Sequence, residues 1–192
     1  MPTAADDHRH IAAHFTDRVI AVQADGWDAV APVDGWVARD VVRHLVTWLP
    51  PFLLSGAGIT LAAGPSVDDD PIAAWVAHTE AVQAVLDDPS TESAVSKNPY
   101  IGEMPLSAAI ANIYTADVFM HTWDLARATG QDDSLDAARC EMMFQGMQPL
   151  DEVLRSSGQY GPRIPVAADA DPQTQLLGFI GRDPAWKPTA IA

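Results

Sequence analysis

The stretch that decides the fold is Leu106–Ala126, LSAAIANIYTADVFMHTWDLA, in which small and apolar residues occupy almost every position around a helix. A helix that is apolar on nearly all sides lies at the centre of a domain. The spacing predicts that this helix opens near Met104-Pro105 and ends at Thr129, where Gly130 supplies a left-handed cap. A central helix of this kind requires other helices packed around it.

Further helices are predicted on both sides of this central one. Three are expected before it: one at about residues 5–24, one that starts at residue 37 and is bent or ended by Pro50-Pro51, and one from Pro71 through Leu86. Two are expected after it: one at about residues 134–155, with a serine cap at its start and a kink at Pro149, and a short one at 172–180. Residues 55–70 are expected to form a loop, and 163–167 offer only a short extended segment without an obvious partner. The sequence therefore predicts an all-α single domain over 1–192, a four-helix bundle with a fifth helical segment over about 5–157 and a short irregular extension over about 158–192.

Charge and cysteine content restrict the partners and the compartment. The chain of 192 residues carries 11 basic and 26 acidic residues, a net charge of −15, so nucleic acids and anionic membranes are not expected to bind. No apolar run reaches the roughly 18 residues of a membrane-spanning helix, and the first residues do not follow a secretory signal pattern. The single cysteine, Cys140, suits a reducing compartment and is expected to be buried and inert. We therefore expect a cytoplasmic protein, and a homodimer is compatible with the sequence.

Asp117, His121 and Asp124 are the only acidic, basic or histidine residues of the central helix between Leu106 and Ala126. At about 100° per residue they fall on one stripe, shared with Ile110 and Ile113, which predicts that they point into the core. A carboxylate buried alone costs several kcal/mol unless it is paired, protonated or bound to a metal. This placement therefore requires a partner for each carboxylate.

A divalent metal ion is one such partner. Asp117 and His121 are one helical turn apart and can share an ion, and His44, at the border of the apolar stripe of the second helix, is the expected third ligand. Two imidazoles and one carboxylate leave a coordination position open, as catalytic sites do. Asp124 is expected to orient a ligand histidine from behind. Zinc is the first expectation for the ion, and nickel or iron suits the same donors.

The same residues also have a purely structural interpretation, in which no metal binds. Acid-x-x-x-His pairs occur by chance, and a lone inward histidine is more often a hydrogen-bonded core residue than a ligand. His78 is either a substitute third ligand in the pocket or a packed core residue. Trp48 and Trp123 are candidate pocket walls, although they are spaced, like Trp36 and Trp75, as core anchors would be.

Four segments resemble a known family. They are Gly35-Trp36 with residues 41–46 (VVRHLV), residues 117–126 (DVFMHTWDLA), residues 128–130 (ATG), and residues 171–184, which end in G-R-D-P. They resemble the DinB-like metal-binding bundles, and within them the branch that contains the N-terminal domain of mycothiol-dependent maleylpyruvate isomerase. The resemblance implies an up-down-down-up bundle in which His44, Asp117 and His121 occupy the metal-ligand positions.

The resemblance also implies a chemistry. In such relatives the metal holds the thiolate of a small cofactor thiol such as mycothiol, which attacks a small electrophile. The isomerase has glutamate at the position of Asp117 and a larger C-terminal domain, so its own reaction and substrate do not carry over.

Three hypotheses follow for the function. The leading one is a metal- and thiol-dependent transferase or isomerase with a small-molecule substrate. The second is a non-catalytic protein of the same fold that binds a metal or a small ligand. The third is a helical interaction protein in which Asp117 and His121 merely bond each other. None of the three assigns a catalytic residue.

Overall fold

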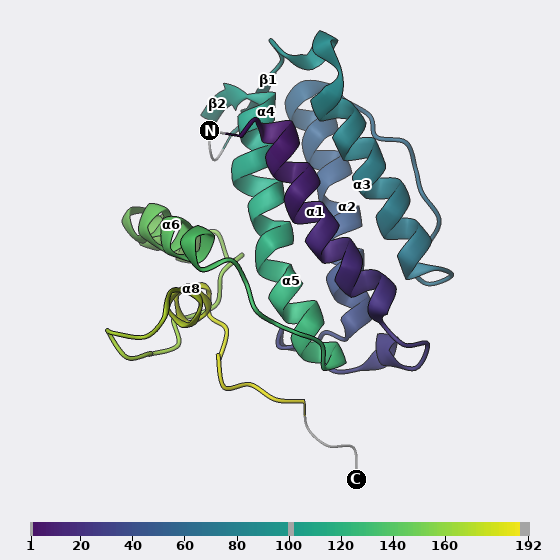
Figure 1. Ribbon diagram of the computed structural model, residues 1–192. Helices are drawn as coiled ribbons and strands as arrows, with labels where there is room; N and C mark the ends of the chain where they lie inside the picture. Colours follow the sequence, from purple (N-terminus) through teal and green to yellow (C-terminus); the bar gives the residue numbers. More distant parts are fainter. Residues whose placement is uncertain (1, 100–101, 189–192) are drawn as a thin grey trace.

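The computed structural model describes residues 2–99 and 102–188 and is mostly helical, as the sequence predicts (Figure 1). The helices are α1 (Ala4–Ala21), α2 (Ala38–Ala57), α3 (Pro71–Asp87), α4 (Leu106–Ala109), α5 (Ala116–Thr129), α6 (Ala137–Met147), α7 (Asp151–Ser156) and α8 (Pro172–Ile180). Two strands, β1 (Val95–Asn98) and β2 (Gly102–Pro105), pair as an antiparallel hairpin. Short 3-10 turns lie at Gly26–Asp28, Pro89–Thr91 and Gln148–Leu150. In the described part of the chain, none of the helices combines the length and the apolar character needed to cross a membrane.

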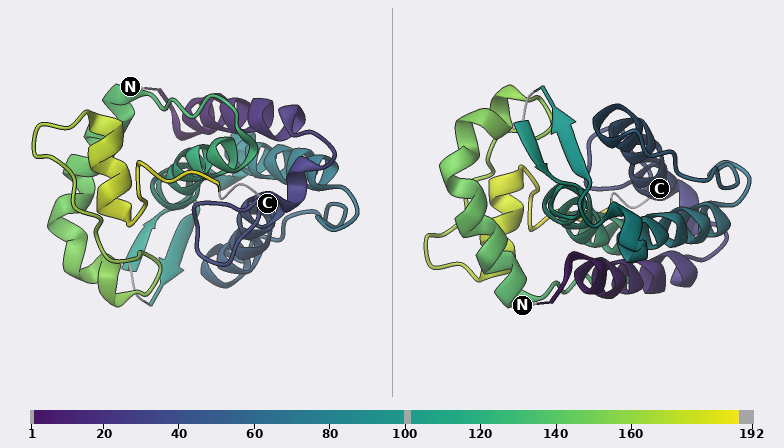
Figure 2. Two further views of the ribbon diagram at one scale, coloured as in Figure 1. Left: turned by 90° about the horizontal axis from the view of Figure 1, so that it is seen from below. Right: turned by 90° about the horizontal axis from the view of Figure 1, so that it is seen from above.

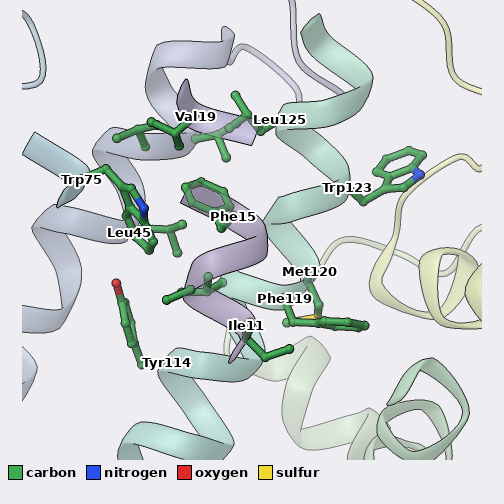
Figure 3. Packing of buried hydrophobic residues seen from close by; sticks show 14 of the residues in the cluster. Ile11, Phe15, Val19, Leu45, Trp75, Tyr114, Phe119, Met120, Trp123 and Leu125 are labelled. Atoms are coloured by element: carbon green, nitrogen blue, oxygen red, sulfur yellow. The ribbon is translucent and has the colours of Figure 1, made fainter. Parts of the chain in front are cut away.

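The core lies between α1, α2, α3 and a rod made of α4, a π-helical segment (Ile110–Thr115) and α5 (Figure 1). Helix α1 contacts α3 and α5, and α2 contacts the same two helices. Phe15, Leu45, Trp75 and Leu125, one from each of these elements, are fully buried and meet in the interior (Figure 3). Burying such side chains stabilises the fold by about 1.5–3 kcal/mol each.

Several helix ends follow the expected capping chemistry. The Asp70 side chain accepts a hydrogen bond from the amide of Ala73 at the start of α3, and Gly130 closes α5 with a positive φ of 69°. Helix α6 differs, because it begins at Ala137 under the Asp136 side chain and not under a serine at 134. The expected interruption at Pro149 is confirmed by the 3-10 turn between α6 and α7.

Pro50 and Pro51 do not end α2, which was one of the two outcomes, a bend or an end, that the sequence predicted for them. The helix continues through Pro50 and Pro51 to Ala57, so residues 55–57 are helical and only the segment after Gly58 is a loop. Each proline removes one backbone hydrogen bond of the helix. Leu49 and Leu53, both fully buried, anchor the helix on either side of the prolines, and this packing outweighs the lost bonds.

The central helix also differs from its expected form. It starts at Leu106, and the π segment Ile110–Thr115 shifts the register of the residues that precede it relative to those that follow. Ile113 is consequently only half-buried, and Tyr114 takes the fully buried position. The β1–β2 hairpin was not predicted. Residues 163–167 form no strand, although the Ile164 amide donates to the Gly178 carbonyl.

The C-terminal part lies along one side of α5. Helix α6 packs against α8, and both lie beside the four packed rods in the views from below and from above (Figure 2). Cys140 is buried in this layer, as expected. After Gly181 the chain returns to α5, where the Arg127 side chain donates to the Pro184 carbonyl at 3.0 Å. This return brings the G-R-D-P segment to the central helix.

Candidate metal centre

The structure brings His44, Asp117 and His121 together. His44 projects from α2, and the other two project from successive turns of α5. The His44 Nε2 and Asp117 Oδ2 atoms are 3.0 Å apart, and His121 Nε2 lies 3.5 Å from Asp117 Oδ1. One potential ligand atom from each residue lies within 4.8 Å of those of the other two. The three residues that the sequence predicted as ligands therefore form one cluster.

These distances are compatible with a shared divalent ion. Ligand atoms about 2.0–2.2 Å from a tetrahedral zinc ion lie roughly 3.4 Å from one another. The His121–Asp117 distance of 3.5 Å matches this value, and the closer His44–Asp117 pair forms a hydrogen bond at 3.0 Å. The His44 side chain is 32% exposed and that of Asp117 is 20% exposed, whereas that of His121 is 7% exposed. Solvent and small molecules can therefore approach the cluster from the side of His44.

The charges within the cluster favour an ionised carboxylate. Burial alone raises the pKa of Asp117, but His121, His44 and the Trp48 indole outweigh burial, and the net pKa is lowered. Burial alone lowers the pKa of His121, but Asp117 and Asp124 outweigh it, and the net pKa is raised. The cluster thus offers an anionic oxygen and imidazoles held in place, and a cation that binds here displaces protons from the imidazoles.

Asp124 and Arg182 hold His121 from behind. His121 Nδ1 lies 2.8 Å from Asp124 Oδ2, and Arg182 donates to both oxygens of the same carboxylate at 2.9 and 3.0 Å. The Asp124 side chain is 1% exposed. Burial would raise the pKa of Asp124, yet His121 and Arg182 hold it below its usual value. An ionised Asp124 accepts the Nδ1 proton of His121 and leaves Nε2 directed towards Asp117, the arrangement that carboxylate–histidine–metal sites use.

Arg182 is the residue that sequence reasoning missed. It lies 58 positions after Asp124, and its only signal was its place in the G-R-D-P segment, to which no role was given. Gly181, with a φ of 85°, ends α8 and turns the chain so that Arg182 meets α5. The predicted role of Asp124 in orienting a histidine matches the observed contact, but the guanidinium that completes it comes from the C-terminal extension.

Aromatic side chains flank the cluster. Trp48 donates its indole N–H to Asp117 Oδ2 at 3.0 Å, which places this candidate wall at the site. Trp36, which the spacing suggested only as a core anchor, stacks on His121 with ring centroids 5.7 Å apart and lies 5.2 Å from the His44 ring. Burial, followed by the charge of Asp117, raises the pKa of Tyr160, a residue of the extension, to about 12.

Two candidates of the sequence lie elsewhere. Trp123 is fully buried under the Arg127 guanidinium, which lies 5.3 Å from its ring, and it points away from Phe15 (Figure 3). This follows from its position two residues after His121, because residues two apart lie on different faces of a helix. His78 is buried beside Tyr114, with ring centroids 5.6 Å apart, and is not part of the metal-ligand cluster in the described part of the chain.

Comparisons with known proteins find similar proteins from a mycobacterium. Proteins from two strains of Mycobacterium tuberculosis, strains CDC 1551 / Oshkosh and ATCC 25618 / H37Rv, are each 27% identical to this chain over 177 residues, which cover 91% of this chain and 95% of each relative. Both are described as uncharacterized proteins. No family model and no solved structure matches the chain.

Proposed function

We propose that this chain binds one divalent metal ion through His44, Asp117 and His121. The observation that carries the proposal is the convergence of three potential ligand atoms from two helices within 4.8 Å, with Asp124 bonded to the far side of one imidazole. Zinc is the metal that we expect, and nickel or iron would accept the same donors.

The arrangement of the helices supports a DinB-like bundle of up-down-down-up order. In Figure 1, α1 and the rod ending in α5 run in one direction, and α2 and α3 run in the opposite direction. The segment between Gly58 and Asp70 runs back along the length of the helices, so that α2 and α3 can point in the same direction. The contacts of α1 and α2 with both α3 and α5 agree with such a bundle.

We further propose that the protein is a metal- and thiol-dependent transferase or isomerase that acts on a small electrophile. A bound divalent cation lowers the pKa of a thiol or water ligand and so supplies a nucleophile near neutral pH. The support in this chain is the exposed side of His44, where a thiol such as mycothiol could approach. A cytoplasmic location belongs to the same proposal, because the lone cysteine and a small-thiol cofactor both suit a reducing compartment.

Two other functions remain candidates. The 3.0 Å hydrogen bond between His44 Nε2 and Asp117 Oδ2 gives the imidazole and the carboxylate a partner without a metal ion, which favours a structural role for the cluster. A non-catalytic metal-binding protein would need only the three ligands and Asp124, without a reacting group.

Metal analysis tests the proposal directly. We expect protein purified without chelator to contain about one divalent ion per chain by elemental mass spectrometry. His121→Ala and His44→Ala are expected to lose the ion, and His10→Ala, which changes an exposed histidine of α1, is expected to keep it. A wild-type protein that neither contains nor takes up an ion in stoichiometric amount would leave only the structural role.

Turnover separates the two metal-dependent functions. The metal-loaded protein, incubated with a low-molecular-weight thiol and a panel of small electrophiles, is expected to consume thiol faster than His121→Ala does. An intact metal site without any turnover would favour the non-catalytic function.

A further inference from the structure

The arginines of this chain are already engaged with its own carboxylates. Each one lies within 3.8 Å of an aspartate oxygen: Arg9, Arg18, Arg39, Arg43, Arg127, Arg139, Arg155, Arg163 and Arg182. Lys97 pairs with Glu103. Within residues 2–99 and 102–188, Lys187 alone among the basic residues has no carboxylate partner, and its side chain is exposed. A substrate carboxylate or phosphate would therefore compete with an aspartate of the chain for any guanidinium in the described structure.

The charges at the metal centre lead to the same conclusion. Arg182 neutralises Asp124 through two hydrogen bonds, so neither contributes net charge to the site. A divalent ion on Asp117 would retain one positive charge, which a single bound thiolate would cancel. Any further negative charge on the bound molecule would face a chain whose net charge is −15.

Aromatic side chains lie beside the exposed ligand, His44. Trp36 and Trp48 are both half-buried and have their rings 5.2 and 6.2 Å from the ring of His44. Phe52 extends this aromatic surface, with its ring 5.8 Å from that of Trp48. Large aromatic faces that are partly exposed next to a polar centre bury apolar parts of a ligand.

We propose that the molecule that binds at the exposed side of the centre is uncharged beyond its metal-binding atom and packs against these aromatic side chains, and that carboxylated and phosphorylated molecules are selected against. This inference rests on the proposed function, because it concerns the ligand of the proposed metal ion. It adds the substrate class, which the three ligand residues do not specify.

A matched pair of thiols tests the substrate class without an activity assay. The Co²⁺-loaded protein would be titrated with benzyl mercaptan and with 4-(mercaptomethyl)benzoic acid, and the sulfur–cobalt charge-transfer absorption would be followed. The para carboxylate cannot reach the ion that holds the sulfur, so the two thiols differ only in the charge they place near the walls. We expect benzyl mercaptan to bind at least about tenfold more tightly at low salt, and the difference to shrink as salt screens the protein's charge.

Variants of the walls show whether the preference comes from these residues. Trp36→Ala is expected to weaken benzyl mercaptan binding several-fold, and Trp36→Phe, which keeps an apolar face over His44, is expected to restore most of it. Lys187→Ala should leave the ratio between the two thiols unchanged. Cobalt content is measured for every variant, so that a loss of metal is not mistaken for a loss of thiol binding.

The possible outcomes are distinct. Equal or tighter binding of the carboxylated thiol to a stoichiometrically loaded protein would overturn the substrate class and leave metal binding intact. A failure of the protein to bind Co²⁺ would overturn the proposed function itself.

Discussion

Replacing Arg182 by methionine should destabilise the protein far more than the loss of one surface ion pair would. Methionine keeps much of the apolar stem of the side chain but removes both hydrogen bonds to Asp124, whose side chain is 1% exposed. Breaking a buried ion pair on one side costs about 3–5 kcal/mol, because the remaining charge has no compensation. Arg182 is itself 17% exposed, so water can partly replace it, and we expect the lower end, about 3 kcal/mol.

This loss is measurable by thermal unfolding at pH 7. For a chain of this length each kcal/mol shifts Tm by about 2–4 °C, so Arg182→Met should melt about 6–12 °C below the parent. Arg163→Met is the matched control, because Arg163 is 47% exposed and pairs with Asp151 at the surface. Such a pair contributes at most about 1 kcal/mol. Asp124→Asn combined with Arg182→Met should recover part of the loss, because no uncompensated charge then remains. An Arg182→Met protein that melts within about 2 °C of the parent would refute the reasoning.

Three further predictions concern metal affinity, acid and thiol reactivity. Arg182→Met should weaken zinc binding by about 10–100-fold in competition with a chromophoric chelator, because His121 loses its orientation; unchanged affinity would show that the extension does not support the site. Burial lowers the pKa of His8 and of His78 to about 4 from 6.5, so the unfolded state binds protons more readily, and stability should fall as the pH drops from 6.5 towards 4, by up to about 3 kcal/mol per histidine. If the urea concentration at half-unfolding stayed constant between pH 6.5 and 4, in the wild type and in His8→Leu alike, the claim that burial lowers the pKa of these histidines would be contradicted. Burial raises the pKa of Cys140 to about 11, so a disulfide reagent at pH 8 should modify this thiol only after denaturation, and rapid reaction of the native protein would show that it is accessible.

The part of the metal centre that lies on α5 was predictable because its spacing falls within one regular helix. Asp117, His121 and Asp124 all belong to α5, where the 3.6-residue period holds, so their shared face follows from the sequence. Counting 100° per residue from Leu106 predicts that Ile113 is buried, but this is wrong because Ile113 lies in the π segment, which has wider turns. No residue of that segment indicates a π-helix in the sequence.

The surroundings of the cluster were not predictable in the same way. Trp36 and Arg182 reach the site through turns, and their contacts depend on how separate elements pack and not on a repeating period. The continuation of α2 past Pro50 is a similar case, since burial of the leucines on both sides decides against the local preference of proline.

Asp124 is the point at which the metal centre and the C-terminal extension meet. One of its oxygens faces His121 and both bond Arg182, so the orientation of the imidazole and the docking of the extension depend on the same buried carboxylate. Coupling between two events is reciprocal: if docked Arg182 tightens metal binding by some factor, bound metal must tighten the docking of the extension by the same factor. The metal-loaded protein should therefore protect the segment after α8 from proteolysis better than the metal-free protein does. Because Arg182→Met removes the link but keeps the three ligands, metal should no longer change the rate of cleavage there, and a metal effect that persists in this variant would place the coupling outside Asp124.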